Sequence, residues 1–515
     1  MSKKPNILLI LTDQQRFDAL GAQGNKVIKT PNLDRLASEG VLYERCMTPS
    51  PLCQPARACA VTGLAASRLG CLENNVPKYY DFAHALPQML HEQGYYCAGV
   101  GKMHFSNKPY QVTYGMDSLV LSEETRGVRF PKRKEEMVFD DYDRFLISHH
   151  RWGWEKPTEI GYNEIKPLLT PLEKKYHVTQ WCGDETVKAL SALKDSSKPF
   201  FLCSSFVKPH VPYDCPRHLS HLYDPALMPE PWVSEHDGTK ENGYIAQYKV
   251  DKEFDLYSRH ARDLSLSYYY ANITFIDEQI GRILDTLEAI GKKDDTLVIF
   301  TSDHGDLMGD HGLFYKCFGF EGSMHVPLLV RYPGHVKAGT RKDDLVTLLD
   351  LYPTVLEAAG LKPVEEVPGK SLLSSDGHEH VFSEVLYPPY YLCHLRTKEW
   401  KYLFYQNGGV EALYHLTEDP HELVDLSRQA GYRDILSALR AQAEAYIRRY
   451  GRKEGVLDDQ GHLLAHPLVF PPQSPSPFGR MPWDYRIPVA DLQEDELKKT
   501  FWSSRQEDWS DHLRK

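Results

Sequence analysis

Short apolar runs separated by amphipathic stretches recur through the first two thirds of the chain. NILLIL, YCAGV, FFLCSSFV and TLVIF are each of strand length and bounded by polar residues, so they predict strands buried on both faces. Residues 31–39 and 273–291 between them carry apolar side chains at helical spacing and predict helices. This alternation predicts an α/β fold with a large, mostly parallel sheet sandwiched by helices.

Helix-end residues set expected limits for two of the helices. Thr30 is placed as an N-cap, Pro31 as the first helical residue and Gly40 as the residue past the end, which predicts a helix over 31–39. In the same way, DLYPTVLEAAG predicts a helix that is closed by Gly360.

The pattern changes after about residue 375. HVFSEVL, YYLCHLRT, WKYLFYQ and EALYHL are short, aromatic-rich and closely spaced, so they predict a smaller antiparallel sheet, followed by a helix. We therefore expect a catalytic α/β unit over 1–375 and an antiparallel-sheet unit over 376–450. Residues 451–515, rich in Pro, Trp and charge, are expected to form an extended arm on the body or on another subunit, which would make a homo-oligomer.

Charge and apolar run length limit the partners. The formal net charge of −11 over 515 residues argues against a nucleic-acid surface. No run approaches the roughly 20 apolar residues of a membrane span. The apolar run at Ile7–Leu11 is short and has no cleavage site after it, so no signal peptide and a cytoplasmic location are expected. None of the ten cysteines forms a C-x-x-C pair, and most are expected to be reduced and buried.

Polar residues follow the predicted buried strands directly. In open parallel sheets, ligands bind outside the carboxyl ends of the strands, so these residues are expected to meet at one edge. They are Asp13, Gln14, Lys102, His104, Lys208, His210, Asp303 and His304.

These residue types support two kinds of binding. Carboxylates, an amide and an imidazole suit Ca²⁺, Mg²⁺ or Mn²⁺ better than a thiolate-binding metal. Lysines, together with Arg57 and Lys316, supply positive charge for a tetrahedral oxyanion such as sulfate or phosphate. The histidines are candidate proton carriers. The sequence therefore predicts a polar active site with a divalent metal and an anion pocket.

The stretch CQPAR (53–57) resembles the C-x-P-[S/A]-R signature of type I sulfatases, the formylglycine-dependent members of the alkaline phosphatase superfamily. PNILLILTDQQR, GVGKMHF, FVKPHVPYDCP and FTSDHGDLMGDHGLFYK resemble further elements of that family, in its order. The ending LYHLTEDPHE resembles its C-terminal sheet. The resemblance covers about residues 5–430 and implies an alkaline phosphatase-like fold.

The resemblance implies a metal centre and a modified residue. Cys53 would be oxidised to formylglycine by a formylglycine-generating enzyme. The implied metal ligands are Asp13, Gln14, Asp303, His304 and the converted Cys53. Many sulfatases carry a second Asp at Gln14 and often Asn at His304. The pairs Asp13–Gln14 and Asp303–His304 resemble those of the branch that includes phosphonate monoester hydrolases and promiscuous arylsulfatases. Ca²⁺ is the metal usual in the family, with Mn²⁺ or Mg²⁺ as alternatives.

The resemblance also implies a mechanism for a sulfate monoester, whether aryl, sugar or small alkyl. One hydroxyl of the formylglycine hydrate would attack sulfur, and loss of the second hydroxyl's proton would expel sulfate. Arg57 would hold the hydrate if Cys53 lies at a helix start, since positions i and i+4 then share a helix face. Lys102 and Lys316 would neutralise the sulfate oxygens, His210 would serve the leaving group and His104 would take the proton. Lys208 is a weaker candidate for substrate contact.

Three other functions are considered. A phosphonate monoester or phosphodiester hydrolase could use the same site, but those enzymes carry neutral hydroxyl residues where Lys102 and His104 stand. A thiol phosphatase needs Arg six positions after its nucleophilic Cys, and this chain has Cys59 there. A non-catalytic protein on this fold is expected to lack at least one core group, and all of them are present.

Overall fold

The computed structural model describes residues 4–74, 84–105, 113–123, 139–152, 165–233, 243–251, 254, 257–387 and 390–469. Its centre is an eight-stranded sheet in the order β10-β2-β9-β8-β1-β6-β3-β4. The strands are β1 (Asn6–Asp13), β2 (Val41–Met47), β3 (Tyr96–Gly101), β4 (Ser118–Leu121), β6 (Phe200–Pro209), β8 (Thr296–Ser302), β9 (His325–Arg331) and β10 (Thr340–Thr347).

The large sheet is mostly parallel, as predicted. Only β9 runs antiparallel to its neighbours, β2 and β8. All four apolar runs that predicted buried strands form strands of this sheet, and β8, β1, β6 and β3 are parallel neighbours in that order.

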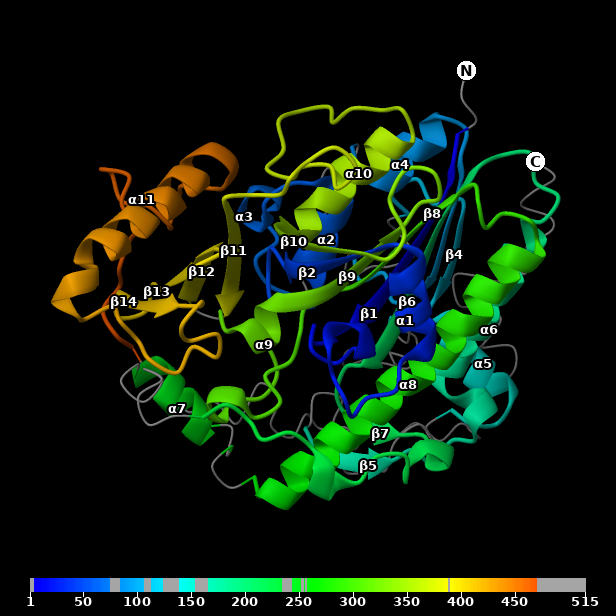
Figure 1. Cartoon of the computed structure of the whole chain (residues 1–515), viewed down its shortest axis with the longest axis horizontal. Helices are drawn as coiled ribbons and strands as arrows, with labels where there is room; N and C mark the ends of the chain where they lie inside the picture. Colours follow the sequence, from blue (N-terminus) through cyan, green and yellow to red (C-terminus); the bar gives the residue numbers. More distant parts are fainter. Residues whose placement is uncertain are drawn as a thin grey trace, which may run out of the picture.

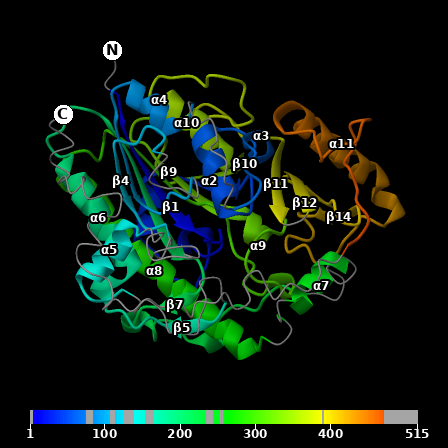
Figure 2. The same ribbon diagram turned by 180° about the vertical axis from the view of Figure 1, so that it is seen from behind.

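Helices cover both faces of this sheet (Figures 1 and 2). Ile7, Leu9 and Leu11 of β1 share a core with α2, α4 and α10, whereas Leu8 and Ile10 share one with α1, α6 and α8. This follows from the period of two along a strand, which sends alternate side chains to opposite faces. The helices are α1 (Pro31–Glu39), α2 (Cys53–Thr62), α3 (Ala66–Leu69), α4 (Leu86–Glu92), α5 (Asp141–Ser148), α6 (Val178–Ala192), α7 (Gly243–Asp251), α8 (Arg259–Ala289), α9 (Glu321–Met324), α10 (Leu351–Ala358) and α11 (Arg433–Tyr450).

The two helices with predicted limits agree with the structure except in one detail. Thr30 occupies the N-cap position of α1, but its side chain makes no cap hydrogen bond to the helix backbone. Its hydroxyl instead donates to Asp34 Oδ1 at 3.2 Å and accepts from the backbone N–H of Gly21 at 2.9 Å. The C-terminal end of α10 leads into Gly360, whose φ of 74° suits glycine.

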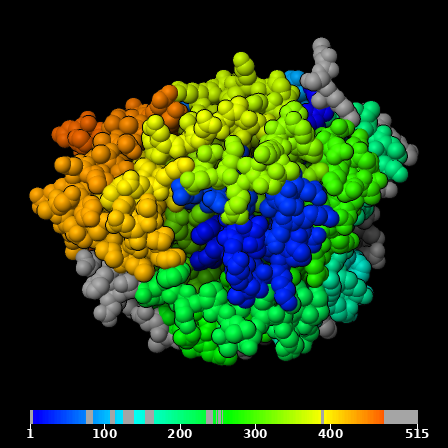
Figure 3. Space-filling view, in the orientation of Figure 1, coloured from blue at the N-terminus to red at the C-terminus, as the bar shows by residue number. Residues whose placement is uncertain are grey.

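A separate antiparallel sheet lies at one end of the molecule (Figure 1), and its residues belong to the yellow-to-orange part of the surface in Figure 3. It consists of β11 (His380–Tyr387), β12 (Tyr390–Thr397), β13 (Trp400–Tyr405) and β14 (Val410–His415). One face packs on α11, and the other shares a core with Phe318 and Phe320 of the larger unit. A two-stranded ladder joins β5 (Pro167–Leu169) and β7 (Tyr213–Cys215).

The start of the predicted arm lies on the C-terminal sheet. His466 pairs with the connection between β13 and β14, through its N–H to Gln406 O and through its carbonyl to Gly408 N, both at 2.8 Å. Residues 470–515 of that arm lie outside the described residues. Among the helices of the described ranges, none has both the length and the apolarity that a bilayer crossing needs.

Candidate active site

Neighbouring strands of the large sheet end at one edge, and the residues singled out in the sequence stand there. Asp13 is the last residue of β1, and Lys102 follows β3. Asp303 follows β8, and His210 follows β6. Because these strands are parallel and adjacent, their carboxyl ends bring together groups that lie up to 290 residues apart in the chain, such as Asp13 and Asp303.

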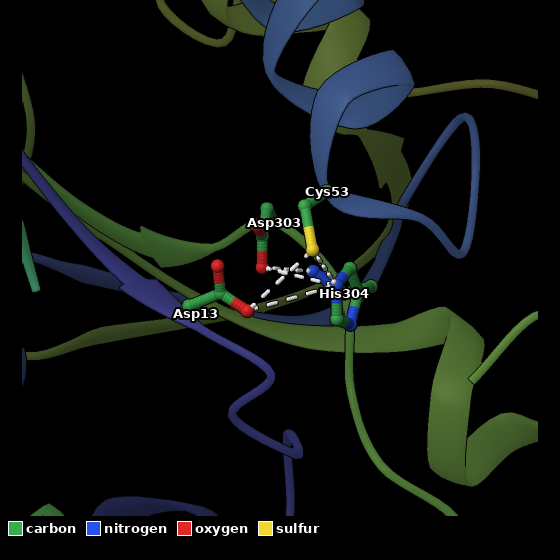
Figure 4. A group of neighbouring side chains, drawn as sticks. All are labelled: Asp13, Cys53, Asp303 and His304. Atoms are coloured by element: carbon green, nitrogen blue, oxygen red, sulfur yellow. Dashed lines mark hydrogen bonds and ion pairs between the residues drawn. The ribbon is translucent and has the colours of Figure 1, made fainter. Parts of the chain in front are cut away.

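Four buried side chains form a tight cluster at this edge (Figure 4). Asp13, Cys53, Asp303 and His304 each offer one metal-binding atom, and these atoms lie within 4.8 Å of one another. Cys53 is the first residue of α2, and its Sγ is 3.2 Å from His304 Nε2 and 3.7 Å from Asp13 Oδ1. The start of a helix thus carries the thiol into a cluster of oxygen and nitrogen donors.

The ring of His304 is oriented as a ligand. Its Nδ1 lies 2.9 Å from the carbonyl oxygen of Gly305, which fits an N–H donor at that position and leaves a lone pair on Nε2. Burial lowers the pKa of His304 to about 4, against the opposing effect of Asp303. The imidazole is therefore neutral near pH 7, the state in which it binds metals.

Gln14 brings its amide oxygen to the same place. Its backbone is left-handed, with φ of 72°, and its N–H donates to Asp303 Oδ1 at 3.1 Å. Gln14 Oε1 accepts from Lys316 Nζ at 2.8 Å, while Gln14 Nε2 donates to Asp306 at 2.5 Å. Tyr269 holds this turn, since its hydroxyl donates to Gln14 O at 2.7 Å.

Arg57 lies between the two carboxylates of the cluster. Its Nε is 2.7 Å from Asp303 Oδ2, and its Nη2 is 3.3 Å from Asp13 Oδ2. Its Nη1 donates to the carbonyl of Lys102 and, at 2.8 Å, to Ser205 Oγ. These carboxylates raise the pKa of Arg57 against the effect of burial, so the guanidinium is a permanent cation. Arg57 stands one helical turn after Cys53, because α2 begins at Cys53, and this meets the condition under which the two residues share a helix face.

Two lysines add positive charge. Lys102 Nζ is 2.8 Å from Asp13 Oδ2, and Lys316 Nζ donates to Cys53 Sγ at 3.2 Å. Burial disfavours the charged form of Asp13, but Lys102 and the other nearby cations outweigh it and hold the pKa of Asp13 well below its usual range. Burial likewise opposes the charge of Lys316, and Cys53 and Asp13 raise its pKa in spite of this. Two buried ammonium groups thus stand beside the cluster, one at Asp13 and one at Cys53.

Two buried histidines stand at the ends of neighbouring strands. His210 Nδ1 lies 2.8 Å from the carbonyl oxygen of Val211, which directs the lone pair of a neutral ring to Nε2. His104 has φ of 50°, and its backbone N–H donates to both carboxylate oxygens of Glu123 at 3.0 Å.

Lys208, the weaker candidate for substrate contact, contacts its own segment of the chain in this structure. Its ammonium donates to the carbonyls of His210 and Pro212, both at 3.0 Å, and pairs with Asp214. These partners lie in the connection that follows β6 and in β7 itself. The sequence cannot distinguish a lysine near a strand end that contacts ligand from one that contacts its own loop. In the structure, the ion pair with Asp214 shows that Lys208 contacts its own segment.

Sequence reasoning missed Ser205, Glu123 and Asp306. Ser205 lies inside a buried strand and gives no polar-end signal, and Glu123 lies beyond the β3 strand end, after β4. Asp306 had a signal, since it stands three residues after Asp303 in SDHGD. It is fully buried and accepts from Gln14, from Tyr213 and from two backbone N–H groups.

The donor set fits a hard divalent cation. Two carboxylates, the Gln14 amide oxygen and neutral His304 supply oxygen and nitrogen atoms, which makes this group of buried residues a candidate metal site. A cation here would also relieve the burial of two carboxylates.

Residues 5–361 match the family model described as Sulfatase. The chain belongs to the sulfatase family. It is therefore a sulfuric ester hydrolase, and residues 309–449 match the model described as the C-terminal part of N-sulphoglucosamine sulphohydrolase. The arylsulfatase of Clostridium perfringens is 31% identical over 90% of this chain and 98% of its own length. The choline-sulfatase of Rhizobium meliloti is 31% identical over 82% of each chain.

Solved structures place this sulfatase on a known fold. The phosphonate monoester hydrolase of Agrobacterium radiobacter superposes with a TM-score of 0.73 at 24% identity, over 90% of this chain and 100% of the other. At this identity the likeness concerns the fold alone, and it agrees with the predicted alkaline phosphatase-like architecture.

Proposed function

We propose that this sulfatase hydrolyses a sulfate monoester (aryl, sugar or small alkyl) with a nucleophile derived from Cys53. The observation that carries the proposal is the position of Cys53, whose Sγ lies 3.2 Å both from Lys316 Nζ and from His304 Nε2. A thiol that served packing alone would be expected among apolar side chains, whereas Cys53 lies among the candidate metal ligands Asp13, Asp303 and His304. Conversion to formylglycine by a maturing enzyme would supply a hydrated aldehyde, with one hydroxyl for attack and one for release of sulfate.

Lys102 and Lys316 are proposed to bind the sulfate group. Both ammonium groups reach the cluster, one at Asp13 and the other at the Cys53 side chain. Positive charges already fixed in a buried site stabilise the charge that develops on the sulfate oxygens without reorganisation. Arg57 holds Asp13 and Asp303 in place and orients residue 53 from one turn further along α2.

His210 and His104 are proposed to carry the protons. The Nδ1 of His210 is fixed by the carbonyl of Val211, so Nε2 is the nitrogen that can serve the leaving-group oxygen. His104, whose backbone Glu123 fixes, is proposed to take the proton from the second hydroxyl of residue 53. The rate of hydrolysis is therefore expected to depend on His210 more strongly for an ester with a poor leaving group than for one with a good leaving group.

Asp13, Gln14, Asp303, His304 and residue 53 are proposed to hold one divalent metal, Ca²⁺ with Mn²⁺ or Mg²⁺ as alternatives. When bound, the ion would lower the pKa of the attacking hydroxyl and polarise the sulfate.

Metal removal is expected to lower thermal stability as well as activity, because the ion binds the folded chain alone. Adding Ca²⁺ at about 100 times its Kd to chelated protein is expected to stabilise the fold by about 2.7 kcal/mol. Differential scanning calorimetry with Ca²⁺, Mn²⁺ and Mg²⁺ in turn checks this. The Asp303→Asn variant lacks a proposed ligand carboxylate, so its thermal stability is expected to change little when the ion is added. Equal stability of the wild type with and without all three ions contradicts the metal site.

A phosphonate monoester or phosphodiester hydrolase is the second candidate. The observation in its favour is the pair Gln14 and His304 at the candidate metal site, which carry no negative charge and resemble that branch. Lys102 and His104 argue for sulfate, because that branch is expected to have neutral hydroxyl residues at these two positions.

Relative rates on matched substrates test the proposed function. We expect a higher kcat/KM on 4-nitrophenyl sulfate than on bis(4-nitrophenyl) phosphate or 4-nitrophenyl phenylphosphonate. All three substrates release 4-nitrophenolate, so the leaving group is the same. Protein made with a formylglycine-generating enzyme is needed for the measurement. A clear preference for the phosphorus substrates would replace the proposal by the second candidate. Choline sulfate and sugar sulfates then distinguish the substrate classes.

A further inference from the structure

Asp306 is a buried carboxylate next to the cluster, and the proposed mechanism gives it no role. It lies in the connection that runs from β8 to Lys316, and its side chain is inaccessible to solvent. Its Oδ2 accepts from Gln14 Nε2 at 2.5 Å and from the Tyr213 hydroxyl at 2.7 Å. Its Oδ1 accepts the backbone N–H groups of Met308 and Tyr315, both at 3.0 Å. All four of these partner groups are hydrogen-bond donors, so the carboxylate serves them as an acceptor.

The amide of Gln14 has two chemically different ends, and only the oxygen end can bind a cation. A rotation of the amide by half a turn would exchange them with almost no change in shape. Two neighbours act against that rotation. An acceptor, Asp306, faces the nitrogen end, and a cation, Lys316 Nζ, lies 2.8 Å from the oxygen end.

Asp306 also holds the chain that leads to Lys316. Tyr315, which precedes this lysine, has φ of 67°, and Met308 has φ of 49°. Left-handed backbone at residues with bulky side chains is unfavourable unless the surroundings hold it. The two N–H groups that Asp306 accepts belong to these two residues. One carboxylate thus fixes a proposed metal ligand and the segment that delivers a proposed sulfate-binding lysine.

We infer that Asp306 is a positioning residue, which orients the Gln14 amide so that Oε1 faces the metal. The inference rests on the proposed metal site and adds the reason why a neutral amide can serve there. An amide at position 306 would keep its oxygen toward the two backbone N–H groups. Its nitrogen would then face Gln14 and favour the rotated amide, with an N–H₂ group aimed at the cation.

Calorimetric titration of Ca²⁺, and separately of Mn²⁺, into chelated full-length protein tests the inference without relying on turnover. Asp306→Asn is expected to weaken metal binding by about 10- to 100-fold, the usual effect of losing a partner of a metal ligand. The double variant Gln14→Glu with Asp306→Asn exchanges amide and carboxylate at equal charge and shape. It again presents an oxygen to the metal, and it is expected to bind within about tenfold of the wild type.

Asp310→Asn is the matched control. Asp310 is a buried acid in the same connection, but it accepts from Arg16 Nη1 at 2.8 Å and from Trp232 N at 2.9 Å and makes no contact with Gln14. Its metal affinity is expected to stay within about twofold of the wild type. Equal affinity in Asp306→Asn and the wild type overturns the inference, and so does a loss that the double variant fails to restore. Absence of binding by the wild type overturns the metal site itself, and the inference with it.

Discussion

A Cys53→Ala variant is expected to lose sulfate-ester hydrolysis by about 10⁴-fold or more, since removal of a covalent nucleophile leaves only binding and charge stabilisation. The physical basis is the site around Sγ, which Lys316 and His304 approach to 3.2 Å. Cys59→Ala is the matched control, because Cys59 is equally buried on the same helix. The control is expected to keep its activity within about tenfold, since it loses packing alone.

Mass spectrometry of the peptide that contains Cys53 makes this prediction sharper. Active protein is expected to carry an aldehyde in place of the CH₂–SH group of Cys53, and protein made without the maturing enzyme is expected to be inactive with a free thiol. Fully active enzyme with an unmodified thiol at Cys53, together with undiminished activity of Cys53→Ala, would end the formylglycine proposal. If the active wild type carries an unmodified thiol and the Cys53→Ala variant loses activity, the thiol itself would be the nucleophile.

An Arg57→Met variant is expected to lose about 3–5 kcal/mol of the free energy of unfolding. Arg57 pairs with Asp13 and Asp303, and all three side chains are at most 1% exposed, so the change leaves two buried carboxylates without their shared cation. Urea unfolding followed by circular dichroism measures the loss. The methionine fills a similar volume, so the effect reports charge rather than a cavity.

Arg68→Met is the control for this prediction. Arg68 forms an ion pair with Glu365, but both side chains are more than a third exposed, so water replaces the lost partner. Its effect is expected to be at most about 1 kcal/mol. Equal stabilities of the two variants would show that the Asp13–Arg57–Asp303 arrangement does not stabilise the fold. Analysis of the Cys53 peptide in the Arg57 variant then separates a folding defect from a failure of maturation.

The sequence was sufficient for the fold class and for the sheet edge at which the candidate site residues gather. The apolar runs before Asp13 and Asp303 form adjacent parallel strands. Strands of a parallel sheet are buried on both faces and therefore carry continuous apolar side chains. Since parallel neighbours end at the same edge, the polar residues after them had to meet. The role given to Arg57 depended on a helix that starts at Cys53, and α2 does start there.

The sequence could not decide the direction of every strand or the length of every helix. β9 was not singled out, and it runs against both of its neighbours. α8 extends over Arg259–Ala289, well before the apolar stretch that predicted it. Its first half packs in a second core with residues from distant segments, which no local period reveals.

By itself, the sequence determined four buried strands of the large sheet, where they end and which residue types gather there, because these depend on continuous apolar runs and on the common edge of a parallel sheet. Tertiary structure alone decided the roles of individual polar groups. Lys208 forms an ion pair with Asp214, and Asp306 accepts a hydrogen bond from Gln14. A buried polar atom must find a partner, and that partner can come from any part of the chain, so its identity is a property of the folded molecule.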